Sequence, residues 1–208
     1  GASGAGKSTL LDVLALRKTG GKIEGSMKLN GKPINKEKYH RYIGYVEQVD
    51  IHYPHQTAEE ALMFSARTRL SKRVTKEQRR ALVQRVMNLL DLGKIANTVI
   101  GMGGSMGGLN PEQRKRVSIG VELCCNPQIL FLDEPTSGLD AAGADTVMTA
   151  IEKVALSGTA IICTIHQPSQ RIFFRMTHLY LLAPGGRTVY FGELDERAEN
   201  ILQYFYDT

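Results

Sequence analysis

The stretch GASGAGKST (residues 1–9) decides the fold class of this chain. Two glycines separated by four residues are followed by Lys7 and Ser8, where a run of helix-forming residues begins. Backbone N–H groups of such a loop, and of the helix that it opens, can surround a row of phosphates. A glycine-rich turn with a chance lysine is the alternative, and it does not account for the helix. The stretch therefore predicts a P-loop that binds phosphate.

Each position of the loop has an expected role. Lys7 can reach the outer phosphates, and the Ser8 hydroxyl can ligate Mg²⁺. Backbone contacts to the phosphates are expected from Gly1, Ala2, Ser3, Gly4, Ala5, Gly6 and Thr9.

A second stretch, ILFLDEP (residues 129–135), completes the chemistry. Its apolar part predicts a buried strand that delivers Asp133 to the carboxyl edge of a sheet, where the carboxylate can hold Mg²⁺. Glu134 can orient a water molecule and remove its proton. Alone, Asp-Glu-Pro could be a solvated turn, but together with the P-loop it predicts a site that hydrolyses a phosphate bond.

Three further residues are candidates for this site. His166 follows the strand expected at residues 159–165, where it can sense a terminal phosphate or act as a structural hydrogen bonder. Gln48 follows a strand in YVEQVD and can ligate the metal through its carbonyl oxygen, or lie on the surface. Asp140 in SGLD can cap a helix or lie at a dimer seam, and we favour the seam.

Composition excludes several other classes of protein. With 42% hydrophobic and 23% charged residues in 208, the chain can bury a full core as one domain. The net charge of +5 is compatible with phosphate ligands and gives no reason to expect nucleic acid. Three cysteines form neither a disulfide framework nor a metal-binding spacing, and we expect them to behave as small buried hydrophobes. No apolar run is long enough for a membrane span.

The order of elements indicates an α/β fold with a mainly parallel sheet. Strands are expected at residues 41–46, 128–132 and 159–165, and helices at 7–17, 141–157 and 169–176. A helical block at residues 57–125, with helices at 57–69, 76–92 and 111–125, is inserted between the core segments 1–56 and 126–208. Short antiparallel strands are expected within residues 22–35 and near Leu179 and Val189. We also expect a strand before Gly1 in a longer polypeptide.

The remaining charged residues are expected on the surface. His40, His52 and His55 are interpreted as surface residues. A basic run is most simply a solvated helix and loop, with contact to anionic lipid or an acidic partner as the alternative: Arg67, Arg69, Lys72, Arg73, Lys76, Arg79 and Arg80.

Taken in order, these motifs resemble the nucleotide-binding domain of an ATP-binding-cassette (ABC) protein, and the resemblance covers nearly the whole chain. TIHQPS, VYFGEL and EQRKRVSIGVEL resemble the G subfamily, and LNPEQRKR is similar to the second nucleotide-binding domain of full-length pleiotropic-drug-resistance exporters. The motifs are Walker A (residues 1–8), the Q-loop (Gln48), the signature position (residues 109–113), Walker B (residues 129–134), the D-loop (residues 137–140) and the H-loop (His166).

The resemblance implies a P-loop NTPase fold with a RecA-like core, an inserted helical subdomain and a partial antiparallel β-subdomain. It implies ATP and Mg²⁺ as cofactors, with Lys7, Gln48, Glu134 and His166 as catalytic residues. The implied partners are a second such domain, placed head to tail, and transmembrane domains of the same protein at the cytoplasmic face of a membrane. The expected function is to power export of lipophilic compounds or drugs.

Two alternatives to an exporter domain remain open at the level of sequence. One is a soluble ABC-class ATPase of the translation or DNA-repair type, although no long coiled coil or basic linker is visible. The other is a catalytically dead regulatory domain, which Lys7, Asp133, Glu134 and His166 argue against.

The signature position departs from the family pattern Leu-Ser-Gly-Gly-Gln. Only Leu109 and Gln113 match, with Asn110, Pro111 and Glu112 between them. In the family this segment faces the partner's ATP, but Pro111 lacks an N–H group. Glu112 adds repulsion, because one such pair of like charges at about 5 Å costs about 3 kcal/mol at an effective dielectric near 20. The segment, followed by a basic run at residues 114–116, predicts one impaired and one working composite site.

Overall fold

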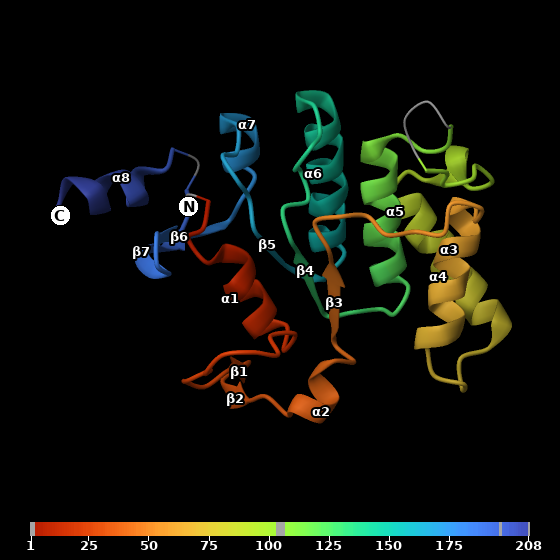
Figure 1. Ribbon diagram of the computed structural model, residues 1–208, viewed down its shortest axis with the longest axis horizontal. Coiled ribbons are helices and arrows are strands. Elements are labelled where there is room, and N and C mark those ends of the chain that lie inside the picture. Colours follow the sequence, from red (N-terminus) through yellow and green to blue (C-terminus); the bar gives the residue numbers. More distant parts are fainter. Residues whose placement is uncertain (1–2, 103–106, 196, 208) are drawn as a thin grey trace.

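The computed structural model describes residues 3–102, 107–195 and 197–207 and has helices packed on both faces of a small parallel sheet (Figure 1). The helices are α1 (Lys7–Leu14), α2 (Lys36–Tyr39), α3 (Ala58–Arg69), α4 (Lys76–Leu89), the 3-10 turn η1 (Gly93–Ile95), α5 (Pro111–Leu123), α6 (Ala141–Leu156), α7 (Gln170–Phe173) and α8 (Glu199–Tyr206). The strands are β1 (Lys28–Leu29), β2 (Lys32–Pro33), β3 (Ile43–Val46), β4 (Ile129–Leu132), β5 (Ala160–Cys163), β6 (His178–Ala183) and β7 (Arg187–Glu193).

The central sheet has the order β3-β4-β5 and is parallel throughout, as the sequence predicts. Val46, Leu132 and Cys163 are register partners at the carboxyl ends of the three strands. The residues that follow these strands therefore meet at one edge of the sheet, which is where α/β proteins place their ligands.

Side chains of the middle strand alternate between two apolar clusters, because successive residues of a strand point to opposite faces. Ile129 and Phe131 pack with residues of α1 and α2. Leu130 and Leu132 pack with the larger cluster that includes residues of α3, α4, α5 and α6. All four residues of β4 are buried, as its continuous apolar run predicts.

Helices α3, α4 and α5 lie together on one side of the sheet in Figure 1, and each begins with a reciprocal capping box. The expected helix at residues 76–92 ends earlier, at Leu89, because Asp91 adopts a left-handed conformation (φ 51°). The Leu92 N–H then donates to the Met87 carbonyl and the Asp91 N–H donates to the Asn88 carbonyl, which closes the helix end.

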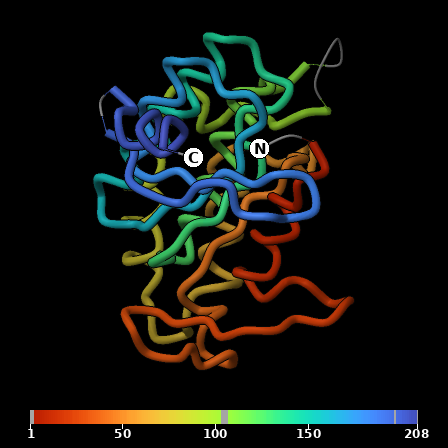
Figure 2. Tube along the Cα trace, turned by 90° about the vertical axis from the view of Figure 1, so that its left-hand side faces the viewer, coloured from red at the N-terminus to blue at the C-terminus, as the bar shows by residue number. Residues whose placement is uncertain are grey.

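Antiparallel strands lie outside the central sheet. β1 pairs with β2, and β6 pairs with β7 through a hairpin that has a register shift between Leu181 and Leu182. Figure 2 shows this hairpin and α8 on the side that faces the viewer. The sequence pattern located both strand pairs but missed α2 and α8, and it made α7 too long. Among the described helices, none is long and apolar enough to cross a bilayer.

Candidate functional site

Asp133, directly after β4, joins three segments at the carboxyl edge of the sheet. Its Oδ1 atom accepts a hydrogen bond from the Ser8 hydroxyl of α1 at 2.9 Å. The same atom accepts a second from the Thr164 hydroxyl, just after β5, at 2.6 Å. Asp133 is buried, so these bonds hold its carboxylate in one place. The structure thus brings together Ser8 and Asp133, which the sequence assigns to the metal.

Thr164 is a site residue that sequence reasoning did not identify. Besides donating to Asp133, its Oγ1 accepts a hydrogen bond from the Glu134 N–H at 2.9 Å. Thr164 follows Cys163, the register partner of Leu132, so it lies beside Asp133. A polar residue directly after an apolar strand was the available signal, but only the register between β4 and β5 gives it a partner.

Glu134 has an unusual backbone conformation, with φ at 44°. A left-handed conformation costs a residue with a side chain about 1–2 kcal/mol. The Thr164 hydroxyl helps to hold this turn, and the Glu134 carboxylate accepts a hydrogen bond at Oε2 from the Gln48 Nε2 atom at 3.1 Å. Gln48 and Glu134 are therefore in direct contact, as two residues of one site should be.

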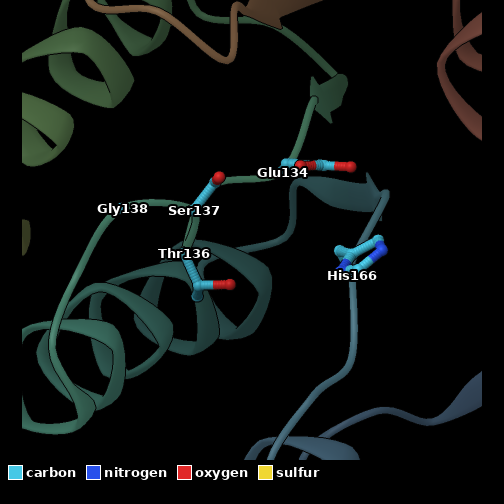
Figure 3. A pocket seen from close by; sticks show the side chains of 5 residues that line it. All are labelled: Glu134, Thr136, Ser137, Gly138 and His166. Atoms are coloured by element: carbon cyan, nitrogen blue, oxygen red, sulfur yellow. The ribbon is translucent and has the colours of Figure 1, made fainter. Parts of the chain in front are cut away.

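His166 and Glu134 border one pocket, which Thr136, Ser137 and Gly138 also line. Figure 3 shows the two side chains reaching this space from different segments, one after β4 and one after β5. The pocket lies between the expected base and the expected phosphate sensor. A water molecule and a terminal phosphate are the groups that such a pair would hold.

The phosphate loop has the local geometry that an anion site needs. Gly4 and Gly6 have φ values of 74° and 88°, which only glycine adopts without strain. Gly6 precedes the first residue of α1, and no side chain caps that helix end. The start of a helix carries a partial positive charge, which complements an anion. Gly1 and Ala2, which the sequence assigns to the same loop, lie outside the described residues.

Mg²⁺ is compatible with the donor set. Ser8 Oγ and Asp133 Oδ1 are hard oxygen ligands within 2.9 Å of each other, and Mg²⁺ is bound by few protein oxygens plus phosphates and water. Gln48 donates through its amide nitrogen, which leaves its carbonyl oxygen as a further possible ligand. No group of three or more His, Cys, Asp or Glu side chains in the described part of the chain could hold a metal alone.

The signature segment uses most of its polar groups within its own helix start. The Asn110 side chain accepts from the Gln113 N–H at 2.8 Å, and the Gln113 side chain accepts from the Asn110 N–H at 3.1 Å. Pro111 occupies the first helical position, and Leu109 is buried. The capped, proline-initiated helix start that the sequence suggests is what the structure has.

Glu112 does not carry the unopposed charge that the sequence suggests. Its Oε1 lies 2.5 Å from the Arg116 Nε in an i,i+4 ion pair, with side-chain exposures of only 16% and 11%. The Glu112 side chain also lies beside Gly143 near the start of α6. The predicted repulsion of about 3 kcal/mol assumed a free carboxylate, so it is too large.

The basic run after this helix start is directed inward. Arg114 donates to the carbonyls of Leu109 and Gly101, and Arg116 donates to those of Leu90 and Asp91. Lys115 is only 2% exposed and donates to carbonyls of residues 47 and 48. Each of the three cations ties α5 to a different segment of the chain.

The contacts of His52 and Asp140 bear on what was expected of these two residues. His52 is not a surface residue, because it is half-buried and its Nε2 lies 2.8 Å from the Ser118 hydroxyl; burial lowers its pKa. His40 and His55 are exposed, as expected. Asp140 caps α6 by accepting from the Gly143 N–H at 2.9 Å, so the capping role exists whether or not a dimer seam forms there.

The three cysteines are unreactive because of where they lie. Burial raises the pKa of Cys124 to about 12, and those of Cys125 and Cys163 to about 11, which makes all three poor nucleophiles.

Most of the basic run at residues 67–80 is exposed, as expected. Arg79 is half-buried, and Arg69, although exposed, donates from both of its terminal nitrogens to Glu122 of α5.

Comparison with known proteins places this geometry in a family. Residues 1–137 match the family model described as ABC transporter. The chain is 53% identical to ABC transporter G family member 2 of Dictyostelium discoideum and 48% identical to ABC transporter G family member 31 of Arabidopsis thaliana. It is 47% identical to pleiotropic drug resistance protein TUR2 of Spirodela polyrhiza. Each match covers 99% of this chain but only 14–15% of the relative.

Proposed function

The chain belongs to the ABC transporter family, and we propose that it is the domain that binds and hydrolyses ATP in a membrane exporter. One observation carries this proposal. A single oxygen of the Walker B aspartate, Asp133 Oδ1, accepts hydrogen bonds from the P-loop Ser8 and from Thr164, which follows the neighbouring strand. Glu134 and Gln48 contact each other beside them. This combination supports nucleotide chemistry more strongly than a P-loop sequence alone.

Binding would be centred on the phosphate loop and α1. The positive end of the α1 helix dipole complements negative charge, and Lys7 at its first position adds a full positive charge. Ser8 and Asp133 would hold Mg²⁺, with the Gln48 carbonyl oxygen as a further ligand. When bound, the ion neutralises charge on the outer phosphates and fixes their orientation.

Glu134 is the general base in this proposal. Its carboxylate borders the pocket and is oriented by the Gln48 amide, so it can accept a proton from a water molecule there. His166, on the other side of the same pocket, would contact the terminal phosphate. The Thr164 hydroxyl helps to hold both carboxylate residues in position, because it bonds to the Asp133 side chain and to the Glu134 backbone.

The partners are inferred from the family. We propose a second nucleotide-binding domain, placed head to tail with Asp140 at the seam, and transmembrane domains of the same protein. The residues at 57–125 form the helical subdomain in this assignment, and residues 1–56 and 126–208 form the core. The domain would work at the cytoplasmic face of a membrane. Since one relative is named a pleiotropic drug resistance protein, lipophilic compounds are the proposed cargo.

The signature segment supports a split between the two composite sites. Pro111 offers no N–H group, and the side chains of Asn110, Glu112 and Gln113 are engaged within α5. The composite site that includes this segment would therefore be impaired. The site built on Lys7 and Glu134 would work with a signature segment from the partner domain.

Glu134→Gln in the full-length protein tests the proposal. The substitution keeps the shape and the contact to Gln48 but removes the base, so single-turnover hydrolysis should fall by about 100-fold or more. Equilibrium binding of ATP should remain within about twofold, because the phosphate loop is unchanged. Hydrolysis at the wild-type rate would show that Glu134 is only a turn residue and would refute this assignment.

A further inference from the structure

Lys115 is a buried cation with no part in the reaction proposed above. It lies in the second turn of α5, and its side chain is 3% exposed. Its Nζ donates to the carbonyls of Glu47 at 3.1 Å and Gln48 at 2.9 Å, and it forms an ion pair with Asp50 Oδ1 at 2.9 Å. An ammonium group has three N–H donors, so these partners can use all of them. A buried charge is tolerated only with such complete pairing.

The segment that contains Gln48 has a second attachment to the same helix. Ser118, one turn after Lys115, donates to Asp50 Oδ1 at 2.6 Å, and its hydroxyl lies 2.8 Å from His52 Nε2. Residues three apart lie on one face of a helix, so Lys115 and Ser118 hold residues 47–52 from the same side. The placement of Gln48 is therefore set by α5 as well as by β3.

The same face of α5 also contacts the strand before Gln48. Glu122, one turn beyond Ser118, accepts a hydrogen bond at Oε2 from the Tyr45 N–H at 3.1 Å. Gly44 permits this approach, because a Cβ atom there would lie 2.8 Å from Leu130 Cδ1 and 3.3 Å from Glu122 Oε2. Contacts with α5 thus continue from β3 into the segment after it. Lys115 is the contact nearest to the site residue.

We propose that Lys115 is a positioning residue for hydrolysis: it fixes the Gln48 backbone so that the Gln48 side chain meets Glu134 and the metal site. This inference rests on the proposed roles of Gln48 and Glu134. Lys115 acts through Gln48, because its own nitrogen is bonded to the backbone of residues 47 and 48. A charge on Nζ is needed for the pairing with Asp50, which an apolar side chain of the same length cannot provide.

A double-mutant cycle in the full-length protein tests this role. Lys115→Met keeps the length and loses the donors, so kcat for ATP should fall about tenfold, since misplacing a reacting group by about 1 Å can cost 100-fold. KM for ATP should stay within about twofold, because the P-loop is untouched. In a Gln48→Ala background the same substitution should lower kcat by less than about twofold, because the residue it positions is gone. An equal loss of kcat in both backgrounds would overturn the proposal.

Two further variants keep the test decisive. If Lys115→Met does not fold, Lys115→Arg enters the same cycle, and its loss of kcat should also vanish with Gln48→Ala. Lys153→Met is the matched control, because it makes the same change in a lysine whose ion pair with Asp91 links α6 to the residues after α4, and kcat should be unchanged. If Glu134→Gln stops hydrolysis and Lys115→Met leaves kcat unchanged, the positioning role alone is refuted. If Glu134→Gln hydrolyses ATP normally, the proposed function fails with it.

Discussion

The carboxyl edge of the sheet and the start of α5 use polar side chains in opposite ways. At the sheet edge, contacts link different elements around a pocket, as in Ser8 with Asp133 and Gln48 with Glu134. In the signature segment at the start of α5, the side chains of residues 110, 112 and 113 bond within the helix, with Asn110 bonded to Gln113 and Glu112 paired with Arg116. Removing one side chain should therefore damage the chemistry in the first region and mainly the stability of a helix in the second.

Lys7→Ala should have the largest effect on the sheet-edge site. The change removes a positive charge from the first position of α1, and hydrogen bonds to charged groups contribute about 1.5–3 kcal/mol. We expect kcat/KM for ATP to fall roughly 100-fold, with binding and hydrolysis both weakened. Equilibrium binding and single-turnover rates in the full-length protein separate the two, and normal ATP binding would contradict the assignment.

Thr164→Val should have an intermediate effect. It leaves Asp133 without one donor and the Glu134 N–H without its acceptor, and an unsatisfied buried group costs about 1–3 kcal/mol. We expect turnover to fall about tenfold, because both carboxylate residues lose their common support.

Thr159→Val is the matched control, because it makes the same change just before β5, away from Asp133. Its turnover should stay within about twofold of wild type. Equal losses in the two variants would mean that Thr164 has no special part in the site.

The sequence predicts contacts at the sheet edge better than contacts at the start of α5. Residues 1–9 and 129–135 have a fixed spacing that phosphate and metal chemistry demand, so the sequence alone pairs Ser8 with Asp133. Thr164 could not be assigned, because its role depends on strand register. The Glu112–Arg116 pair was visible at i,i+4 spacing, but whether the carboxylate turns toward solvent or along the helix depends on the packing of α6.

The fold shows the same division. Alternation of strands and helices predicted the parallel sheet and the helical block, because apolar periodicity reflects burial directly. The inward direction of Lys115 and Arg116 was not predictable, because charged residues in sequence indicate solvent and their carbonyl partners are distant in the chain. The left-handed conformation of Asp91, which ends α4, was not predicted from the sequence either.

Lowering the pH should weaken the attachment between α5 and the segment after Gln48, with a smaller effect than the substitutions. Burial lowers the pKa of His52; the Asp50 charge and a hydrogen bond with the Arg114 backbone oppose this shift, and the charges of Arg114 and Lys115 add to it. The unfolded state then binds a proton more readily than the folded state, so the stabilising contribution is complete above about pH 6.5 and is lost as the pH falls below it.

Thermal unfolding of the full-length protein at several pH values from about 5.5 to 8 measures this loss. His52→Gln, which cannot titrate, should make the pH dependence shallower. A dependence that is unchanged in this variant would show that His52 does not contribute to it.

Repair of the signature segment tests the central difference between the two regions most directly. Asn110→Ser, Pro111→Gly and Glu112→Gly together would restore one N–H donor toward the partner's nucleotide, at position 111, and remove the Glu112 carboxylate. Two glycines also loosen the helix start by about 1–2 kcal/mol, and Arg116 loses its ion-pair partner. Asn110→Ser alone, which keeps a capping side chain, is the control for changes in folding.

The measurement is single-turnover hydrolysis at the Lys7 site of the repaired full-length transporter, with labelled nucleotide trapped at each composite site. We predict that the chemical step at the Lys7 site stays within about twofold, because its base and metal ligands are untouched. Nucleotide at the partner's P-loop should bind about tenfold more tightly, as expected for one added hydrogen bond to a charged group. Loss of hydrolysis at the Lys7 site in a folded protein would contradict the account of this segment as a helix start without a part in that reaction.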